Sequence, residues 1–210
     1  MRDSPEELLT PEEDGHYNDE ASPVSPHDVD DDYSIELPDD FERRIFGVGV
    51  DSYNRMDWVR GLFRRYKRRR IDCFKALGAA WTCCDNIATH RDALREILAN
   101  ASQDELDAMM CEREREALAD LPAEITIYRG CYMRARDGLS WTLNEQVARK
   151  HPFLNRYVRP GRPALLLKAR VTKERCVLKL DRGEDEIICY KRPECRWNEL
   201  LPQPDANHAR

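Results

Sequence analysis

The stretch "LKLDRGEDEIICY", from Leu178 to Tyr190, carries two carboxylates one residue apart, Glu184 and Glu186. Its pattern predicts two short strands joined by a tight turn at "DRG". Alternate residues of a strand project to one face, so the two glutamates would lie together and repel each other. Such a pair can take up a proton or stabilise a developing positive charge. An exposed edge strand with a charged face is the purely structural alternative.

Two further polar segments precede this pair along the chain. Arg129 and Gly130 end the strand-like segment "AEITIYRG", and Ser140 and Thr142 lie in "GLSWT", which predicts a short strand followed by a helix. An arginine can bind phosphate oxygens through two parallel hydrogen bonds. The chain therefore carries an arginine, a Ser-x-Thr motif and the Glu-x-Glu pair, in this order, on segments that predict strands.

In this order the motifs resemble the arginine-serine-glutamate class of ADP-ribosyltransferases, and more closely the compact ADP-ribosyltransferase-like proteins of bacteria and their phages. The resemblance covers residues 121–190. It implies an NAD-dependent mono-ADP-ribosyltransferase, a toxin or host-modifying effector, that uses NAD as co-substrate, needs no metal and modifies an arginine of a protein acceptor. The implied NAD-binding residues are Arg129, Gly130, Ser140, Thr142 and Glu186, and the implied catalytic residues are Glu186, Glu184 and Ser140.

The chemistry of these residue types agrees with the roles that the resemblance implies. Arg129 would bind the pyrophosphate, and Gly130 would let the backbone approach the nicotinamide amide. Cleavage of the nicotinamide–ribose bond develops positive charge on the ribose, which Glu186 would stabilise while it bonds the 2′-hydroxyl. Glu184 would orient or deprotonate the acceptor, and a glutamate there goes with arginine as acceptor in this class. Ser140 would hold Glu186 in position.

The chain departs from the class in three respects. The interval from Arg129 to Ser140 is short, which predicts a near-direct hairpin of the first two strands. Trp141 replaces the small central residue of the usual serine motif. No aromatic residue closely precedes "GEDE", where one often helps to dock the acceptor, and this difference concerns the choice of target more than NAD binding. Thr142 would support the junction between the second strand and the following helix.

The elements that must position these residues predict an α+β fold. We expect an N-terminal helical part over residues 51–121, followed over 122–192 by a small, mainly antiparallel mixed β core of the ADP-ribosyltransferase type. In the helical part, apolar residues recur at spacings of three and four and form one stripe that ends at Trp81. Thr89 is a candidate N-cap, and Ser102 with Glu105 is a candidate capping box.

The strand-like part contains one expected helix. Thr142 or Asn144 is placed to cap it, and "ALLLKARV", "RCVLKL" and "EDEIICY" then predict three strands. Between them, "NRYVRPGRP" predicts a loop whose arginines, Arg156, Arg159 and Arg162, either assist phosphate binding or are solvated. We expect His90 and His151 to be ordinary surface or capping residues.

Charge divides the 210 residues into an acidic and a basic part. Residues 1–40 hold fifteen acidic residues and one arginine, whereas the rest holds 33 basic residues against 25 acidic ones. Residues 1–40 are poor in large apolar side chains, so we expect a disordered acidic tail that either keeps the protein soluble or masks a basic cleft. Residues 41–193 then form a single ADP-ribosyltransferase-like domain, and 194–210 a polar C-terminal tail.

A basic cluster, "RRYKRRR" at residues 64–70, falls within the first expected helix. It either binds nucleic acid or another polyanion, or is a solvated helix face whose arginine stems cover apolar surface. Arg70 lies near the apolar stripe and is the member we expect to point inward. The sequence therefore leaves two alternatives to the enzyme: a nucleic-acid- or protein-binding module that uses this helix, and a degenerate relative that binds NAD or a partner without transfer.

Cysteine usage and hydropathy indicate the compartment. The eight cysteines are irregularly spaced, Cys83 and Cys84 are adjacent, and the paired spacing of a zinc site is absent from the sequence. The N-terminus lacks the basic start and apolar core of a secretion signal, and no apolar run approaches the roughly 20 residues of a membrane helix. We therefore expect reduced thiols, a cytoplasmic protein of the bacterial or host cytosol, and no membrane partner.

Overall fold

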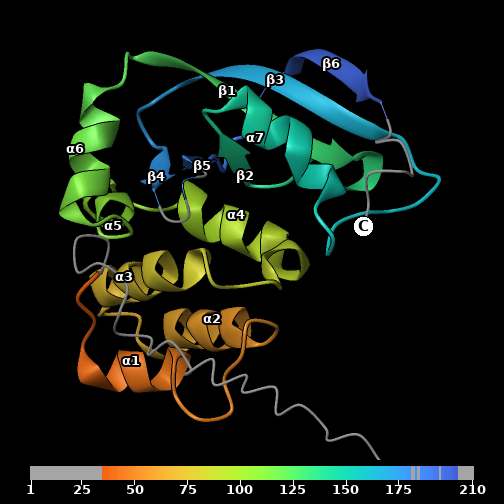
Figure 1. The fold of residues 1–210 in the computed structure, drawn as a ribbon. Coiled ribbons are helices and arrows are strands. Elements are labelled where there is room, and N and C mark those ends of the chain that lie inside the picture. Colours follow the sequence, from red (N-terminus) through yellow and green to blue (C-terminus); the bar gives the residue numbers. More distant parts are fainter. Residues whose placement is uncertain (1–34, 181–182, 184, 194, 203–210) are drawn as a thin grey trace, which may run out of the picture.

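The computed structural model describes residues 35–180, 183, 185–193 and 195–202 (Figure 1). The helices are α1 (Asp39–Ile45), α2 (Arg55–Arg65), α3 (Arg70–Trp81), α4 (Arg91–Ala99), α5 (Gln103–Asp107), α6 (Glu112–Asp120) and α7 (Glu145–Lys150). The strands are β1 (Glu124–Tyr132), β2 (Ser140–Thr142), β3 (Ala164–Thr172), β4 (Val177–Lys179), β5 (Glu186–Ile188) and β6 (Cys195–Leu201). The α+β class is confirmed. None of the helices in this described part has the length and apolar composition needed to cross a membrane.

The described strands form one six-stranded sheet in the order β4-β5-β2-β1-β3-β6. Every pair of these strands runs antiparallel, so the expected mixed character of the sheet is not found among them. β1 pairs with β2 through Tyr128 opposite Thr142, which confirms the near-direct hairpin of the first two strands. β4 pairs with β5, as the pattern around "DRG" predicts.

The last strand, β6, lies where we expected a polar tail. It pairs antiparallel with β3, with Ala164 opposite Leu201, so the sheet continues past residue 193 and the expected boundary is wrong. β6 is an edge strand, and an edge strand tolerates polar residues on its solvated side. Leu201 anchors it, because this side chain is 6% exposed and packs in the same cluster as Ala148 and Leu166.

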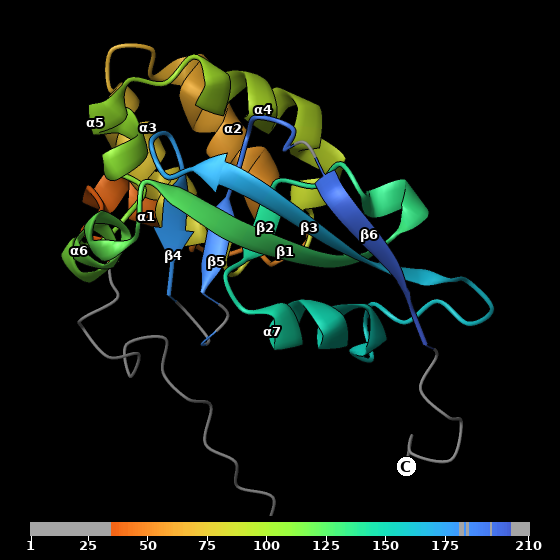
Figure 2. The same cartoon turned by 90° about the horizontal axis from the view of Figure 1, so that it is seen from above.

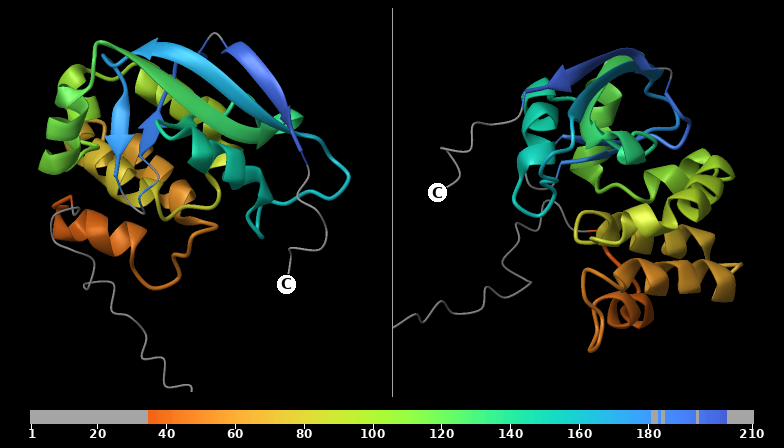
Figure 3. Two further views of the ribbon diagram at one scale, coloured as in Figure 1. Left: turned by 45° about the horizontal axis from the view of Figure 1, so that its top comes forward. Right: turned by 90° about the vertical axis from the view of Figure 1, so that its right-hand side faces the viewer.

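Apolar side chains cover both faces of the central strands. The larger core joins the helices α1 to α4 to one face of the sheet, whereas a smaller cluster joins α7 to the other. β3 shows the division, because Leu165 and Leu167 belong to the larger core while Ala164 and Leu166 belong to the α7 cluster. In Figure 1 the helices α1, α2 and α3 stack below the sheet, and Figures 2 and 3 show α7 against the opposite side of the long strands.

The helical part differs locally from the sequence pattern. The apolar stripe is carried by two helices, α2 and α3, because residues 66–69 form a turn between them. The capping box is confirmed: the Glu105 amide donates to Ser102 Oγ at 3.3 Å, and the Ser102 amide donates to Glu105 Oε2 at 2.9 Å. Thr89 is not an N-cap, since it lies within a short 3-10 turn and α4 begins only at Arg91.

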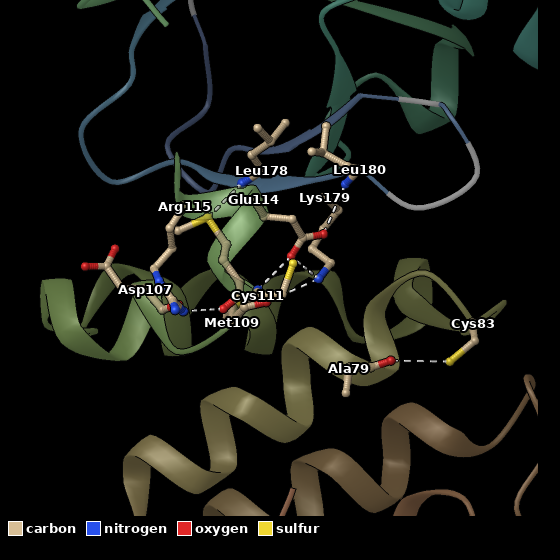
Figure 4. Close-up of polar contacts among 11 residues, drawn as sticks. Ala79, Cys83, Asp107, Met109, Cys111, Glu114, Arg115, Leu178, Lys179 and Leu180 are labelled. Carbon is tan, nitrogen blue, oxygen red and sulfur yellow. Dashed lines mark hydrogen bonds and ion pairs between the residues drawn. The ribbon is translucent and has the colours of Figure 1, made fainter. Parts of the chain in front are cut away.

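A buried ion pair joins α6 to β4 (Figure 4). Lys179 Nζ lies 2.7 Å from Glu114 Oε2, and the two residues are 1% and 0% exposed. Glu114 also accepts hydrogen bonds from the backbone amides of Cys111 at 3.0 Å and Leu180 at 3.1 Å. Because Leu180 directly follows β4, this carboxylate fixes the point where the chain leaves β4 toward β5.

The acidic N-terminal segment is described only at its end. Residues 1–34, most of the expected tail, lie outside the described residues, as do 203–210 of the expected C-terminal tail. Asp39 and Asp40 belong to α1, so the first described helix begins slightly before residue 41. Asp40 pairs with Arg69 at 3.0 Å, which brings the end of the acidic segment into contact with the basic cluster.

Candidate functional site

The sheet order brings together three motifs that are far apart in the sequence. β2 lies between β1 and β5, and the register sets Tyr128 opposite Thr142 and Thr142 opposite Glu186. One cavity is bounded by these strands, by the end of α3 and the loop after it, and by α7 with the loop after it. It is lined by all the described candidate residues: Arg129, Gly130, Ser140, Thr142 and Glu186.

Glu186 is held by a tryptophan of the helical part. Trp81, the last residue of α3, donates its indole N–H to Glu186 Oε1 at 2.8 Å, across 105 positions of sequence. The tryptophan is 1% exposed, and a buried indole N–H usually has an acceptor. The sequence pattern assigned Trp81 only to the apolar stripe. Its indole N–H was the one signal in the sequence that this side chain also makes a polar contact.

Ser140 has a different place from the one that the resemblance implies. It lies opposite Ile188 rather than Glu186 in the β2–β5 register, and its backbone carbonyl accepts a hydrogen bond from Arg129 Nη1. The hydroxyl-bearing residue opposite Glu186 is Thr142. Trp81 therefore supplies the contact to the carboxylate that we expected from Ser140.

Glu184 lies outside the described residues. β5 begins at Glu186, and Asp185 before it has a φ of 43°, which is left-handed and not extended. The extended backbone of β5 therefore begins at Glu186 and does not continue back across Asp185. The two roles implied for the pair must be tested separately for this reason.

Arg129 is a half-buried cation without a carboxylate in an ion pair among the described residues. Its Nε donates to the Ala135 carbonyl at 3.2 Å and its Nη1 to the Ser140 carbonyl, both within or beside the loop that joins β1 to β2. Burial lowers the pKa of this guanidinium, and interactions with Cys131, Glu186 and other acidic groups nearby only partly offset that effect. A desolvated guanidinium with N–H groups beyond these two is suited to bind an anion.

Two glycines allow close approaches around this arginine. A Cβ on Gly138 would lie 2.0 Å from Arg129 Nη2, so the guanidinium can occupy its place only beside a glycine. A Cβ on Gly130 would lie 1.7 Å from the carbonyl oxygen of Ala148 in α7. Gly130 therefore has a packing requirement of its own, independent of any ligand: it lets α7 lie against β1 at the wall of the cavity.

The junction between β2 and α7 is fixed by side-chain caps. Asn144 Oδ1 accepts hydrogen bonds from the amides of Gln146 at 2.9 Å and Val147 at 3.3 Å. Thr142 Oγ1 accepts one from the Asn144 amide at 3.0 Å. Both expected cap residues therefore contribute, and Thr142 supports the strand–helix junction in the manner that the resemblance implies.

The loop after α7 supplies a wall that sequence reasoning missed. The rings of His151 and Tyr157 stack with their centroids 4.4 Å apart and 21° between their planes, and both line the cavity. Arg156, between them in the chain, pairs with Asp85 at 3.0 Å, and this pair also lines the cavity. Of the three loop arginines only Arg156 reaches the site.

His151 is neutral at physiological pH. Burial, reinforced by the positive charges of Arg129 and Arg156, lowers its pKa to about 4, although a hydrogen bond with the Gly130 backbone opposes the shift. The residue is therefore not the ordinary surface histidine that we expected. A neutral imidazole stacked on a phenol presents a flat apolar surface, and this wall stands beside the half-buried guanidinium of Arg129.

The lowered pKa of His151 predicts a pH dependence of stability. The unfolded chain binds a proton at this residue below about pH 6.5 and the folded chain only below about pH 4, so stability falls as pH drops through this window. Between pH 7 and 5 we expect wild type to lose about 2 kcal/mol more unfolding free energy than His151→Asn. Urea denaturation at both pH values measures the difference, and equal losses in the two proteins would contradict it.

The basic cluster at residues 64–70 is split by the turn between α2 and α3. Arg69 donates to Asp72 at 2.8 Å as well as to Asp40, and Arg70 pairs with Glu105 at 2.5 Å and lies over the Phe74 ring. The Arg70 side chain is 41% exposed and that of Arg69 38%, so Arg70 does not point inward more than its neighbour. The remaining cationic members, Arg64, Arg65, Lys67 and Arg68, are exposed.

Comparisons with known proteins return nothing similar to this chain. No model of a protein family matches it, and no curated protein or solved structure matches it either. Within the described residues, no group of three or more histidine, cysteine, aspartate or glutamate side chains is arranged to hold a metal ion. The function must therefore be argued from the cavity itself.

Proposed function

We propose that this protein is an NAD-dependent mono-ADP-ribosyltransferase. The observation that carries the proposal is the convergence of Arg129, Ser140, Thr142 and Glu186 on one cavity from three neighbouring strands. Packing of the core alone gives no reason for an arginine and a glutamate from distant parts of the chain to line one cavity. Binding of a ligand that has an anionic part and a part that becomes cationic gives such a reason.

The anionic part of NAD suits Arg129. Two main-chain carbonyls orient the guanidinium, and burial makes its positive charge costly until an anion is near. A pyrophosphate supplies that anion and accepts the remaining N–H groups. Gly138 and Gly130 leave the space in which the guanidinium and α7 can take these positions.

The reacting part suits Glu186. In the proposed reaction the bond between nicotinamide and C1′ of the ribose breaks, and nicotinamide leaves with the electron pair. The carboxylate of Glu186 stabilises the positive charge that develops on the ribose. A nitrogen of the acceptor then bonds to C1′ and loses a proton, for which the proposal assigns Glu184 as the base, with arginine as the acceptor class.

The stacked His151 and Tyr157 suit a flat aromatic ring of the ligand. Both rings line the cavity with Arg129 and Glu186. The Arg156 guanidinium lies over the Tyr157 ring, 4.8 Å from its centroid, so an aromatic ring of the ligand would meet the neutral imidazole of His151. The proposal therefore assigns a base-binding role to residues outside the three motifs.

The test uses the purified full chain, NAD labelled in its adenylate part, and cell lysate as the source of acceptors. Label on protein supports the proposed transfer, label on nucleic acid changes the acceptor class, and free labelled ADP-ribose indicates hydrolysis. NAD binding without cleavage would identify a degenerate relative. If NAD is neither bound nor cleaved in any of these mixtures, the proposal is lost.

The contact between Trp81 and Glu186 predicts a positioning role for the indole. Trp81→Phe removes the N–H that donates to the carboxylate, and a hydrogen bond to a charged group contributes about 1.5–3 kcal/mol. We expect kcat for NAD cleavage to fall about tenfold or more, and the acidic limb of the pH profile to move upward because the carboxylate has lost a donor.

Trp58→Phe is the matched control for Trp81→Phe, because Trp58 lies on α2 and is 48% exposed. It should leave both kcat and the pH profile unchanged. A Trp81→Phe variant with the wild-type pH profile would show that the indole serves only to fill space.

A further inference from the structure

We propose that Cys176 and Cys189 are a redox-active pair that forms a reversible disulfide between the ends of β4 and β5, with an anionic low-molecular-weight disulfide of the glutathione class as oxidant. Both thiols are reduced in the described structure. The proposal is independent of the proposed transferase activity. It concerns a second cavity, on residues that the site above does not use.

The sheet register sets these two cysteines face to face. β4 and β5 pair with Val177 opposite Ile188, and one step outward in this antiparallel register lie Cys176 and Cys189. The Cys189 amide donates to the Leu139 carbonyl at 2.9 Å, on the side of β2, and is therefore directed away from β4. Cys176 and Cys189 thus occupy a non-hydrogen-bonded position of the ladder, where opposed Cα atoms are about 4.5 Å apart and side chains are closest. A disulfide accepts Cα separations of about 4.4–6.8 Å.

The two thiol groups influence each other. In the structure each thiol donates to a backbone carbonyl, Cys176 Sγ to Thr172 at 3.4 Å and Cys189 Sγ to Lys191 at 3.1 Å. Interaction between the two groups raises the pKa of Cys176 and lowers that of Cys189. Arg95 and Lys191 lower the pKa of Cys189 further through their positive charges. Cys189 is therefore the nucleophile of the pair and Cys176 the resolving thiol, because the thiolate is the reactive form of cysteine.

A cavity gives small molecules a route to this pair. Both cysteines line it, although they are only 3% and 5% exposed. The charged residues that share the lining are Arg170, Arg175, Lys191, Arg192 and Glu174. Four cations against one carboxylate favour an anionic oxidant, even though Arg170 and Arg192 have carboxylate partners elsewhere.

The exchange balances without a further reactant. The Cys189 thiolate attacks one sulfur of the small disulfide and releases one small thiolate, which leaves a mixed disulfide on Cys189. The Cys176 sulfur, after loss of its proton, attacks Cys189 and releases the second small thiol. Two protein thiols are oxidised and one small disulfide is reduced to two thiols.

The test oxidises the reduced full chain with glutathione disulfide, alkylates the remaining thiols and maps the tryptic peptides. Trypsin releases "CVLK" (176–179) and "GEDEIICYK" (183–191), each with one cysteine, so the proposed bond appears as this linked pair. We expect the pair in oxidised wild type and its loss after reduction. Recovery of both peptides only in the alkylated form, or linkage of either to another cysteine, would overturn the proposal.

Two variants assign the order of events. Cys176→Ser should accumulate a glutathione adduct on Cys189, because the resolving thiol is gone, and absence of that adduct would refute the order. Cys73→Ser is the control, since Cys73 is buried in the helical core and should leave the linked pair intact. If a variant fails to fold, the wild-type protein alone still tests the proposal. Oxidation should raise the thermal midpoint of wild type by about 5 °C. An unchanged midpoint, together with peptides that are not linked, would count against the disulfide.

Discussion

Glu186→Gln is expected to lower kcat for NAD cleavage by about 10²–10³ while leaving NAD affinity close to that of wild type. The substitution removes the negative charge that stabilises the ribose cation, but the amide oxygen can still accept the Trp81 N–H that now reaches Glu186 Oε1 at 2.8 Å. The change should therefore act on the reaction and not on the fold. Single-turnover release of nicotinamide measures the rate, and calorimetric titration with NAD measures the affinity.

Glu116→Gln is the matched control, because it makes the same change on an exposed position of α6. It should have the wild-type rate. A Glu186→Gln protein that cleaves NAD at the wild-type rate would remove Glu186 from the reaction. If the rate falls together with the thermal midpoint, the loss belongs to folding, so thermal unfolding of both variants accompanies the assay.

Lys179→Met is expected to cost about 3–5 kcal/mol of unfolding free energy. Lys179 is the cation that compensates Glu114, and both residues are almost completely buried. Removing the ammonium leaves a carboxylate in the core, where an unpaired charge is poorly solvated. The same carboxylate holds the Leu180 amide at the end of β4, so the segment between β4 and β5 should loosen as well.

Guanidinium denaturation of three variants beside wild type tests this expectation. The double variant Glu114→Gln with Lys179→Met should recover part of the loss, because no uncompensated charge remains and the new side-chain amide at position 114 can still accept from one backbone N–H. Arg170→Met breaks an exposed pair with Glu124 and should cost less than about 1 kcal/mol. A Lys179→Met protein within about 1 kcal/mol of wild type would mean that Glu114 finds another partner or takes up a proton.

Local patterns along the chain determined much of this protein. Alternating and buried runs predicted the strands from "AEITIYRG" to "EDEIICY", and the capping box at Ser102 followed from residue types three positions apart. These features depend on neighbours within one turn or one strand, and a single sequence contains that information. The edge strand β6 was not predicted, because its polar sequence shows no alternating or buried apolar pattern.

The residues that meet in the cavity were determined only by the tertiary structure. The order of the motifs suggested that Arg129, Ser140 and Glu186 belong together, but not that β2 lies between β1 and β5. Trp81 and His151 were absent from the expected site, because their contacts join segments far apart in sequence. The two cysteines at the ends of β4 and β5 likewise become visible as a pair only through the antiparallel register and the direction of one amide. A sequence states which side chains are present, whereas burial and pairing across strands decide which of them meet and what charge they carry.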